Sequence, residues 1–330
     1  MTKIIDFESH LQSPEYVKRL IEFDGYPKYS LRNDGRYVWH LSEKIQEPRP
    51  MGKLIQPVED RVKTLDGAGI DVQVLSSNNP ACESFPAKLG IELAKIHNDH
   101  VASFFHKYPD RFMGLCSLPV QDVHESLIEL DRCVGLGFKG LMLFSNVQGE
   151  YVEGEQFWPI YERCEKLRLP VFLHPNVPAR IEPFSDYYLW GPVFGYGADA
   201  AIAALRILMS GLLEKYRRLR IVLGHLGETI PFLIQRIDWA YHKFPEEFTA
   251  IKRKPSDYFI ENFYVDTSGV FNEPSLMCTY ESLGHDRIVF GSDYPFEDIQ
   301  KGIDYVKKSR IPVNDQNRIF EDNLIALLNN

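Results

Sequence analysis

Short apolar runs alternate with longer amphipathic stretches along most of the chain. Eight of the runs predict strands, because their apolar residues are nearly continuous, as in parallel strands buried on both faces. The predicted strands cover residues 3–10, 72–77, 112–119, 138–145, 170–175, 220–227, 263–269 and 287–295. The helical patterns cover residues 58–68, 88–107, 122–136, 155–168, 198–216, 230–243, 273–283, 297–308 and 314–328.

Eight β/α units in one chain favour a closed barrel over an open doubly wound sheet. The first predicted strand is not followed by G-x-G-x-x-G, which counts against a dinucleotide-binding fold. We therefore predict a single α/β domain over residues 1–330, a (β/α)8 TIM barrel with extended loops at its C-terminal face.

Two stretches do not fit the repeat. Residues 11–57 are rich in proline and carry few periodic signals, and residues 176–197 are rich in aromatic residues, proline and glycine. Both stretches follow predicted strands, so both are expected over the C-terminal face of the barrel. Long loops in this position usually build a pocket or a lid.

Composition narrows the class of protein. Of the 330 residues, 44% are hydrophobic and 25% are charged, and the formal net charge is -9. This acidic balance argues against a nucleic-acid-binding surface. Apolar runs are too short to cross a bilayer, and a signal-peptide pattern is not seen, so we expect no membrane association. The five cysteines contain no C-x-x-C pair, which fits reduced thiols in a cytoplasmic protein.

Ionisable residues gather where the predicted strands end. The first strand ends with Glu8 and His10, which lie two residues apart and therefore project to the same side. The fifth ends with His174, the sixth with His225 and the eighth with Asp293. Taken singly, a histidine or aspartate at a strand end is more often a hydrogen-bonded structural residue than a ligand. Together, these side chains would meet at one barrel mouth, where burial is costly unless they pair or bind a metal.

Carboxylate oxygen and imidazole nitrogen are ligands that suit Zn²⁺ or Mn²⁺. The sequence therefore predicts one divalent metal ion at the barrel mouth. The remaining histidines differ, because most fall in helical patterns or loops and are expected on the surface or in helix packing. His40 lies in the first irregular stretch, and its role stays open.

Four motifs carry a resemblance to a known family: FESH at 7–10, LHP at 173–175, GHLGE at 224–228 and GSDYP at 291–295. They resemble the amidohydrolase superfamily, and most of all its metal-dependent decarboxylases of the γ-resorcylate, 5-carboxyvanillate and aminocarboxymuconate semialdehyde type. The resemblance covers nearly the whole chain. Most of the superfamily has His-x-His on the first strand, whereas this chain has Glu8-Ser9-His10, a form that resembles the γ-resorcylate and 5-carboxyvanillate decarboxylases.

The resemblance implies a mononuclear metal site made by Glu8, His10, His174 and Asp293. Binuclear members of the superfamily have a further ligand on the fourth strand, usually a lysine that becomes carbamylated. This chain has no obvious counterpart, because Lys139 lies at the start of its strand and therefore at the opposite end of the barrel. The resemblance also implies non-oxidative decarboxylation of a hydroxylated aromatic acid, without an organic cofactor. Members of this branch are commonly dimers or tetramers, so we expect a homodimer or homotetramer.

Roles follow from this resemblance. Asp293 is expected to donate the proton that replaces CO₂, and His225 and Glu228, three residues apart, to act as an acid–base or orienting pair. Arg236 resembles an arginine that lies near the substrate in this family, and on sequence alone a salt bridge within its helix is the alternative. Phe194 is expected to contact the substrate. Two alternatives stay open: a metal-dependent hydrolase of lactones or amides, in which Asp293 would activate metal-bound water, and a hydratase.

Overall fold

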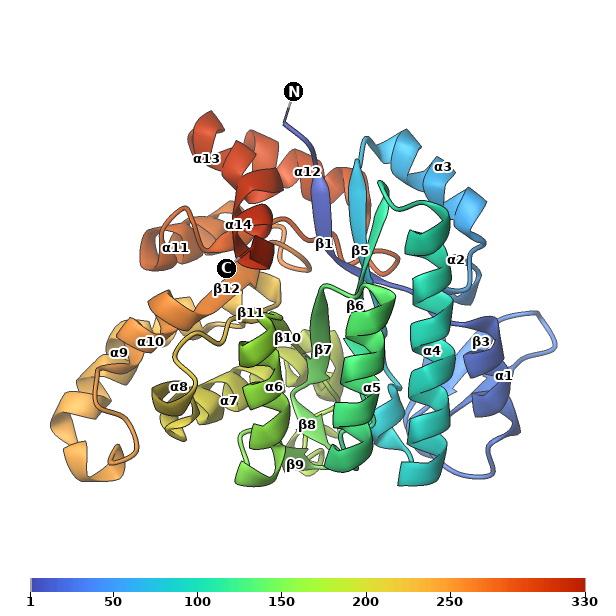
Figure 1. Ribbon diagram of the computed structural model, residues 1–330, viewed down its shortest axis with the longest axis horizontal. Helices are drawn as coiled ribbons and strands as arrows, with labels where there is room; N and C mark the ends of the chain where they lie inside the picture. The colour runs from blue at the N-terminus through green and yellow to red at the C-terminus, as the bar shows by residue number, and fades with distance from the viewer. Residues whose placement is uncertain (1, 330) are drawn as a thin grey trace.

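The computed structural model describes residues 2–329 and confirms the predicted barrel (Figure 1). Eight parallel strands follow one another in the sheet in chain order. They are β1 (Ile5–His10), β5 (Val72–Ser76), β6 (Phe112–Ser117), β7 (Gly140–Phe144), β10 (Val171–His174), β11 (Ile221–Leu223), β12 (Phe263–Asp266) and β13 (Ile288–Val289). All eight predicted strands are present, and each is somewhat shorter than its apolar run.

The barrel closes between β1 and the segment that follows β13. The backbone N–H of Phe7 donates to the carbonyl of Phe290 at 2.8 Å, and that of His10 donates to the carbonyl of Tyr294 at 2.7 Å. In the opposite direction, the N–H of Asp293 donates to the carbonyl of Glu8 at 2.9 Å. The first and last strands of the barrel are therefore fixed to each other at the level where the predicted site residues lie.

Helices cover the outside of the sheet, and α4, α5 and α6 stand side by side (Figure 1). The helices are α3 (Val58–Ala68), α4 (Ala87–Lys107), α5 (Val123–Leu136), α6 (Trp158–Leu167), α7 (Gly195–Met209), α8 (Leu212–Lys215), α9 (Ile230–Lys243), α10 (Pro255–Asn262), α11 (Glu273–Leu283), α12 (Ile299–Lys308), α13 (Val313–Asn317) and α14 (Asn323–Asn329). Local sequence sets several of their ends. For example, the Asp122 carboxylate caps α5 through the N–H of Glu125, and Gly137 ends that helix at φ 107°.

Apolar side chains fill the barrel interior from its N-terminal end. Phe7, Met142, Phe172 and Val222 belong to this cluster and are at most 2% exposed. Leucines of α14 pack against the same cluster and cover the N-terminal end of the barrel. The polar residues are therefore left at the opposite, C-terminal end, as expected for this fold.

The irregular stretch at 11–57 is an ordered layer, which the sequence patterns did not predict. It holds α1 (Pro14–Glu22), an antiparallel sheet of β2 (Lys28–Leu31), β3 (Tyr37–His40) and β4 (Gln46–Arg49), and α2 (Met51–Leu54). Tyr29, Trp39 and Trp190 share one buried cluster. This cluster joins the layer to the second irregular stretch. The short hairpin of β8 (Asn146–Val147) and β9 (Glu150–Tyr151) lies next to that stretch, because the side-chain amide of Asn146 donates to the carbonyl of Val177.

Candidate active site

A cavity of about 500 Å³ opens at the C-terminal end of the barrel. His10, His174, His225 and Asp293 line its floor from four different strand ends, and the two irregular stretches supply much of its wall. The position of the two stretches in the cavity wall agrees with the expectation that they help to build a pocket. A cavity of this size accommodates a small organic molecule.

Three of the four predicted metal ligands form a tight buried group. The ligand atoms of Glu8, His10 and His174 all lie within 4.8 Å of one another. Glu8 Oε1 lies 3.4 Å from Nε2 of His174 and 3.8 Å from Nε2 of His10. This oxygen is buried and has no hydrogen-bond partner among the described residues. A buried carboxylate oxygen without a donor is costly, so this group fits a bound cation.

Both histidines of this group turn the same nitrogen toward the cavity. Nδ1 of His10 lies 2.7 Å from the carbonyl oxygen of Ser77, and Nδ1 of His174 lies 2.8 Å from that of Pro175. A carbonyl can only accept, so Nδ1 carries the hydrogen in each ring and Nε2 of a neutral ring keeps a free lone pair. Metal-ligating histidines are usually oriented in this way. Burial, with repulsion from His10 and His225, lowers the pKa of His174 well below its usual range and favours the neutral form that binds metals.

Asp293 lies beside this group rather than within it. Its Oδ1 is 3.1 Å from Nε2 of His10, and its side chain is 16% exposed to the cavity. The residue has a left-handed backbone at φ 58°, which a bulky side chain rarely adopts without support. Ser292 supplies part of that support, because its N–H and hydroxyl both donate to the buried carboxylate of Asp6.

His225 and Glu228 form a pair at the edge of the same group. Nδ1 of His225 lies 2.6 Å from Oε1 of Glu228, and Nε2 points toward Glu8 Oε1 at 4.0 Å. Burial disfavours the charged imidazole, but the carboxylates of Glu228 and Glu8 outweigh it and raise the pKa of His225 well above its usual range. Two glycines make room for the pair. A Cβ atom at Gly269 would lie 2.4 Å from the His225 ring, and one at Gly197 would lie 2.6 Å from Glu228 Oε2.

Sequence patterns missed the residues that hold Glu8 in place. The hydroxyl of Ser268 hydrogen-bonds to Oε2 of Glu8 and lies 2.6 Å from Oδ1 of Asp266. Both Ser268 and Asp266 are fully buried. Burial raises the pKa of Asp266 well above its usual range, and the neighbouring Glu8 charge adds to this effect. The polar run DTS directly after the apolar part of the seventh predicted strand was the available signal for this contact.

The two predicted substrate contacts lie in different places. Phe194 lines the cavity, where its side chain is 58% exposed. Arg236 does not line the cavity, because it lies on the exposed side of α9 with its guanidinium carbon 4.0 Å from the centre of the Trp239 ring. The expected substrate contact of Arg236 therefore stays a prediction.

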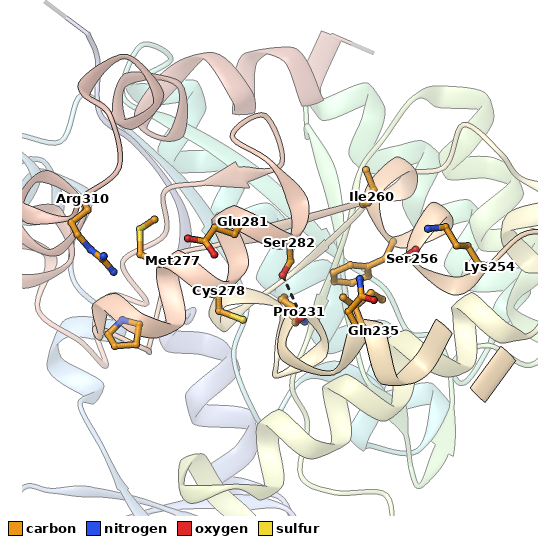
Figure 2. A pocket seen from close by; sticks show the side chains of 13 residues that line it. Pro231, Gln235, Lys254, Ser256, Ile260, Met277, Cys278, Glu281, Ser282 and Arg310 are labelled. Carbon is orange, nitrogen blue, oxygen red and sulfur yellow. Dashed lines mark hydrogen bonds between the residues drawn. The ribbon is translucent and has the colours of Figure 1, made fainter. Parts of the chain in front are cut away.

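A second cavity, of about 560 Å³, lies outside the barrel between α9, α10 and α11 (Figure 2). None of the predicted site residues lines it. Both of its basic residues are already paired, since Arg310 lies 3.2 Å from Glu273 and Lys254 lies 3.6 Å from Asp257. The barrel mouth is therefore the better candidate for catalysis.

Comparison of the sequence with known proteins identifies the family. A model of the amidohydrolase family matches residues 48–329. The chain is 37% identical over 288 residues to a γ-resorcylate decarboxylase of Polaromonas sp., covering 82% of this chain and 87% of the relative.

Solved structures of decarboxylases have the same fold. The crystal structure of 5-carboxyvanillate decarboxylase from Sphingomonas paucimobilis superposes with a TM-score of 0.89 at 29% identity, covering 100% of this chain and 99% of the other. A dihydroxybenzoic acid decarboxylase from Polaromonas sp., with bound manganese and the inhibitor 2-nitroresorcinol, superposes with a TM-score of 0.85 at 31% identity, covering 100% and 97% of the two chains.

Proposed function

This chain belongs to the amidohydrolase family, in its branch of metal-dependent decarboxylases, and on that premise we propose that it is a carboxy-lyase that releases CO₂ from hydroxylated aromatic carboxylic acids. The observation that carries the proposal is the buried group of Glu8, His10 and His174 at the floor of a cavity of ligand size. The decarboxylases named above, which match nearly the whole chain, support the same reaction class.

We assign Glu8, His10, His174 and Asp293 as the residues that hold one divalent ion, Zn²⁺ or Mn²⁺. Manganese in the Polaromonas structure supports this choice of cation for the present chain. When bound, the ion would supply positive charge that attracts the anionic groups of the substrate. Because the free Oε1 of Glu8 and the two Nε2 atoms converge, no large rearrangement is needed to bind it.

Asp293 is assigned as the proton donor. In this step its carboxyl group protonates the ring carbon that carries the carboxylate, and this avoids an aryl carbanion. The bond between that carbon and the carboxylate then breaks, its electron pair returns to the ring, and CO₂ leaves. Asp293 recovers a proton from solvent, to which its side chain has access.

His225 and Glu228 are assigned to orient the substrate or to assist proton transfer. Glu228 fixes the ring of His225 through Nδ1, so Nε2 faces the cavity. A histidine held by a carboxylate keeps one tautomer and one orientation, which improves the positioning of the reacting groups.

We further propose that the protein works in the cytoplasm as a homodimer or homotetramer without an organic cofactor. All five cysteines are free thiols, which supports a reducing compartment. Among residues 2–329, the structure contains no helix that is both long and apolar enough to cross a bilayer. Apolar side chains exposed on α9, such as Phe232 at 79%, support contact with another copy.

Isotope labelling tests the reaction class. The metal-loaded enzyme is incubated with a panel of hydroxybenzoates in D₂O and, separately, with lactones and amides in ¹⁸O-labelled water. A decarboxylase places one deuterium on the ring carbon that carried the carboxylate and releases CO₂. Uptake of ¹⁸O into a carboxyl product without CO₂ release would instead identify a hydrolase.

A further inference from the structure

The loop that carries His225 and Glu228 has an unusual backbone. Five consecutive residues after β11 have positive φ angles: His225 at 50°, Leu226 at 59°, Gly227 at 81°, Glu228 at 49° and Thr229 at 71°. Residues other than glycine adopt this left-handed conformation singly rather than in runs, because the Cβ atom approaches the following carbonyl oxygen. The bulky Leu226 and the β-branched Thr229 are the least suited to it. The surrounding structure must therefore hold loop 225–229 in a conformation that its own sequence disfavours.

Loop 225–229 has one face toward the active-site cavity. The side chains of His225, Glu228 and Thr229 line that cavity, whereas Leu226 is only 4% exposed and belongs to the main hydrophobic core. Pro231, two residues beyond the loop, lines the second cavity, on the outside of the barrel (Figure 2). The loop thus presents polar side chains to the active-site cavity, and an element behind it can fix it without contacting the substrate.

Helix α11 supports the loop from behind. The hydroxyl of Thr279, which is 2% exposed, donates to the carbonyl oxygen of Leu226 at 3.0 Å. Three residues further along the helix, the hydroxyl of Ser282 lies 3.4 Å from the carbonyl oxygen of Pro231 in α9 (Figure 2). Leu276 anchors α11 itself, because its side chain is fully buried in the main hydrophobic core. The Thr279 hydroxyl is therefore a fixed donor to the left-handed run.

A second contact holds the neighbouring residue from the barrel. The backbone N–H of His225 donates to Oδ1 of Asp266, at the end of β12, with a distance of 3.3 Å. The bonds of Asp266 and Thr279 thus fix two successive residues, one from the barrel and one from the outer helices. Without the Thr279 bond, the peptide group between Leu226 and Gly227 could rotate toward an ordinary backbone conformation. The imidazole of His225 would turn with it, and small displacements of reacting groups cost large factors in rate.

We propose that Thr279 is a positioning residue for the reaction: its hydroxyl holds loop 225–229 in the left-handed conformation and so keeps His225 and Glu228 directed at the cavity. This inference rests on the proposed decarboxylase function and adds to it a residue that acts only through the loop. Thr279 lies behind the loop, apart from the cavity lining and from the assigned metal ligands. Its loss should therefore slow the chemical step while substrate affinity and metal content stay unchanged.

Two substitutions separate the hydroxyl of Thr279 from its shape. Thr279→Val removes the donor at nearly constant volume, and with metal-loaded enzyme and hydroxybenzoates we expect kcat to fall roughly 10-fold while KM and metal content change less than about two-fold. Thr279→Ser keeps the donor and should restore most of kcat. Tyr161→Phe is the matched control, because it also removes a buried hydroxyl that donates to a backbone carbonyl at 3.0 Å, that of Val152, away from the cavity. This control should keep wild-type kcat.

Hydrogen exchange measured by mass spectrometry gives a readout that is independent of catalysis. The N–H groups of His225, Gly227 and Glu228 are hydrogen-bonded, so the loop amides should exchange slowly in the wild type. We expect exchange in this segment to be roughly 5- to 10-fold faster in Thr279→Val, and unchanged in Thr279→Ser and Tyr161→Phe. Thr279→Cys, with a much weaker donor, takes the place of Thr279→Val if that variant does not fold, and faster exchange is again expected.

The Glu228→Gln background shows whether Thr279 acts through the loop. Both residues are expected to hold His225, so adding Thr279→Val to this background should lower kcat by less than about two-fold more. A further loss of roughly 10-fold in that background would instead indicate a general structural role and overturn the inference. So would unchanged loop exchange, or an equal loss of kcat in Tyr161→Phe. Absence of CO₂ from every acid with the wild type would overturn the decarboxylase function, and the exchange rates would still test the support of the loop by Thr279.

Discussion

The Oε1 atom of Glu228 lies 2.6 Å from Nδ1 of His225, and this contact fixes the imidazole at the barrel mouth. Glu228 itself is 6% exposed and sits in a left-handed backbone conformation at φ 49°. The pair therefore depends on the fold of the loop after β11 rather than on a regular element. Backbone strain of this kind is typical of functional sites.

Glu228→Gln should lower kcat at least roughly 10-fold while metal content stays near one ion per chain. The amide keeps an acceptor for His225 but removes the charge that stabilises its imidazolium form. Steady-state kinetics and elemental analysis on the same preparation measure both quantities. Wild-type activity in this variant would contradict the role assigned to the pair.

The metal assignment gives His174 and His225, two histidines of the cavity floor, different roles. His174→Ala should lose most of the bound metal, since it removes one of three clustered ligands. His225→Ala should keep the metal and lose activity, because its Nε2 is 4.0 Å from Glu8 and its Nδ1 is held by Glu228. Elemental analysis of dialysed protein decides the matter, and equal depletion in both variants would make His225 a ligand.

Asp293→Asn should lower kcat by at least ~100-fold, because an amide is too weak an acid to protonate the ring. Asp293 is also an assigned ligand, so metal content must be measured before the rate is interpreted. The informative case is a variant with full metal content and a slow rate. A fast rate under that condition would assign the proton donor to another group.

Gly269→Ala should lower kcat roughly 100-fold, because the added methyl group would displace the ring of His225. Gly35→Ala is the matched control, since Gly35 also has a positive φ, 81°, but a Cβ atom there would have no heavy atom within 4 Å. Both variants should lose some stability through backbone strain. Only Gly269→Ala should lose activity. Similar kcat values for the two variants would contradict a role for the close packing of Gly269 against the His225 ring.

Glu83 gives the fold a pH-dependent stability away from the metal ligands. Burial raises the pKa of this carboxyl from 4.5 to about 8. Between these pH values the unfolded chain releases the proton first, so the free energy of unfolding falls as pH rises. Glu83→Gln should remove this dependence and make the protein about 2–4 kcal/mol more stable relative to wild type at pH 8 than at pH 4.5. Urea unfolding at the two pH values tests this, and parallel pH slopes would contradict it.

Much of the barrel was predictable because its strands are buried on both faces. Such strands appear as continuous apolar runs, and their polar ends, such as His174 and Asp293, mark the C-terminal face. The β1 strand shows the limit of this approach. Its register with β5 shifts between Asp6 and Ser9, which indicates a bulge that simple alternation does not reveal.

The ordered layer at residues 11–57 was not predictable from local patterns. Its strands have four residues each, and they are stabilised by distant contacts such as that between Trp39 and Trp190. Short strands with such non-local support leave little periodic signal. For the same reason the local pattern does not place Arg49 in the cavity wall, and it does not show which side of α9 carries Arg236.

The seam between β1 and the segment after β13 has a consequence for biosynthesis. Glu8 and His10 leave the ribosome early, but the hydrogen bonds that close the seam require Phe290, Asp293 and Tyr294. A nascent chain, which grows at about 5–20 residues per second, therefore spends many seconds without a completed cavity floor. Acquisition of the ion should then be a late event of maturation, and chains released before residue 293 should be unable to retain it.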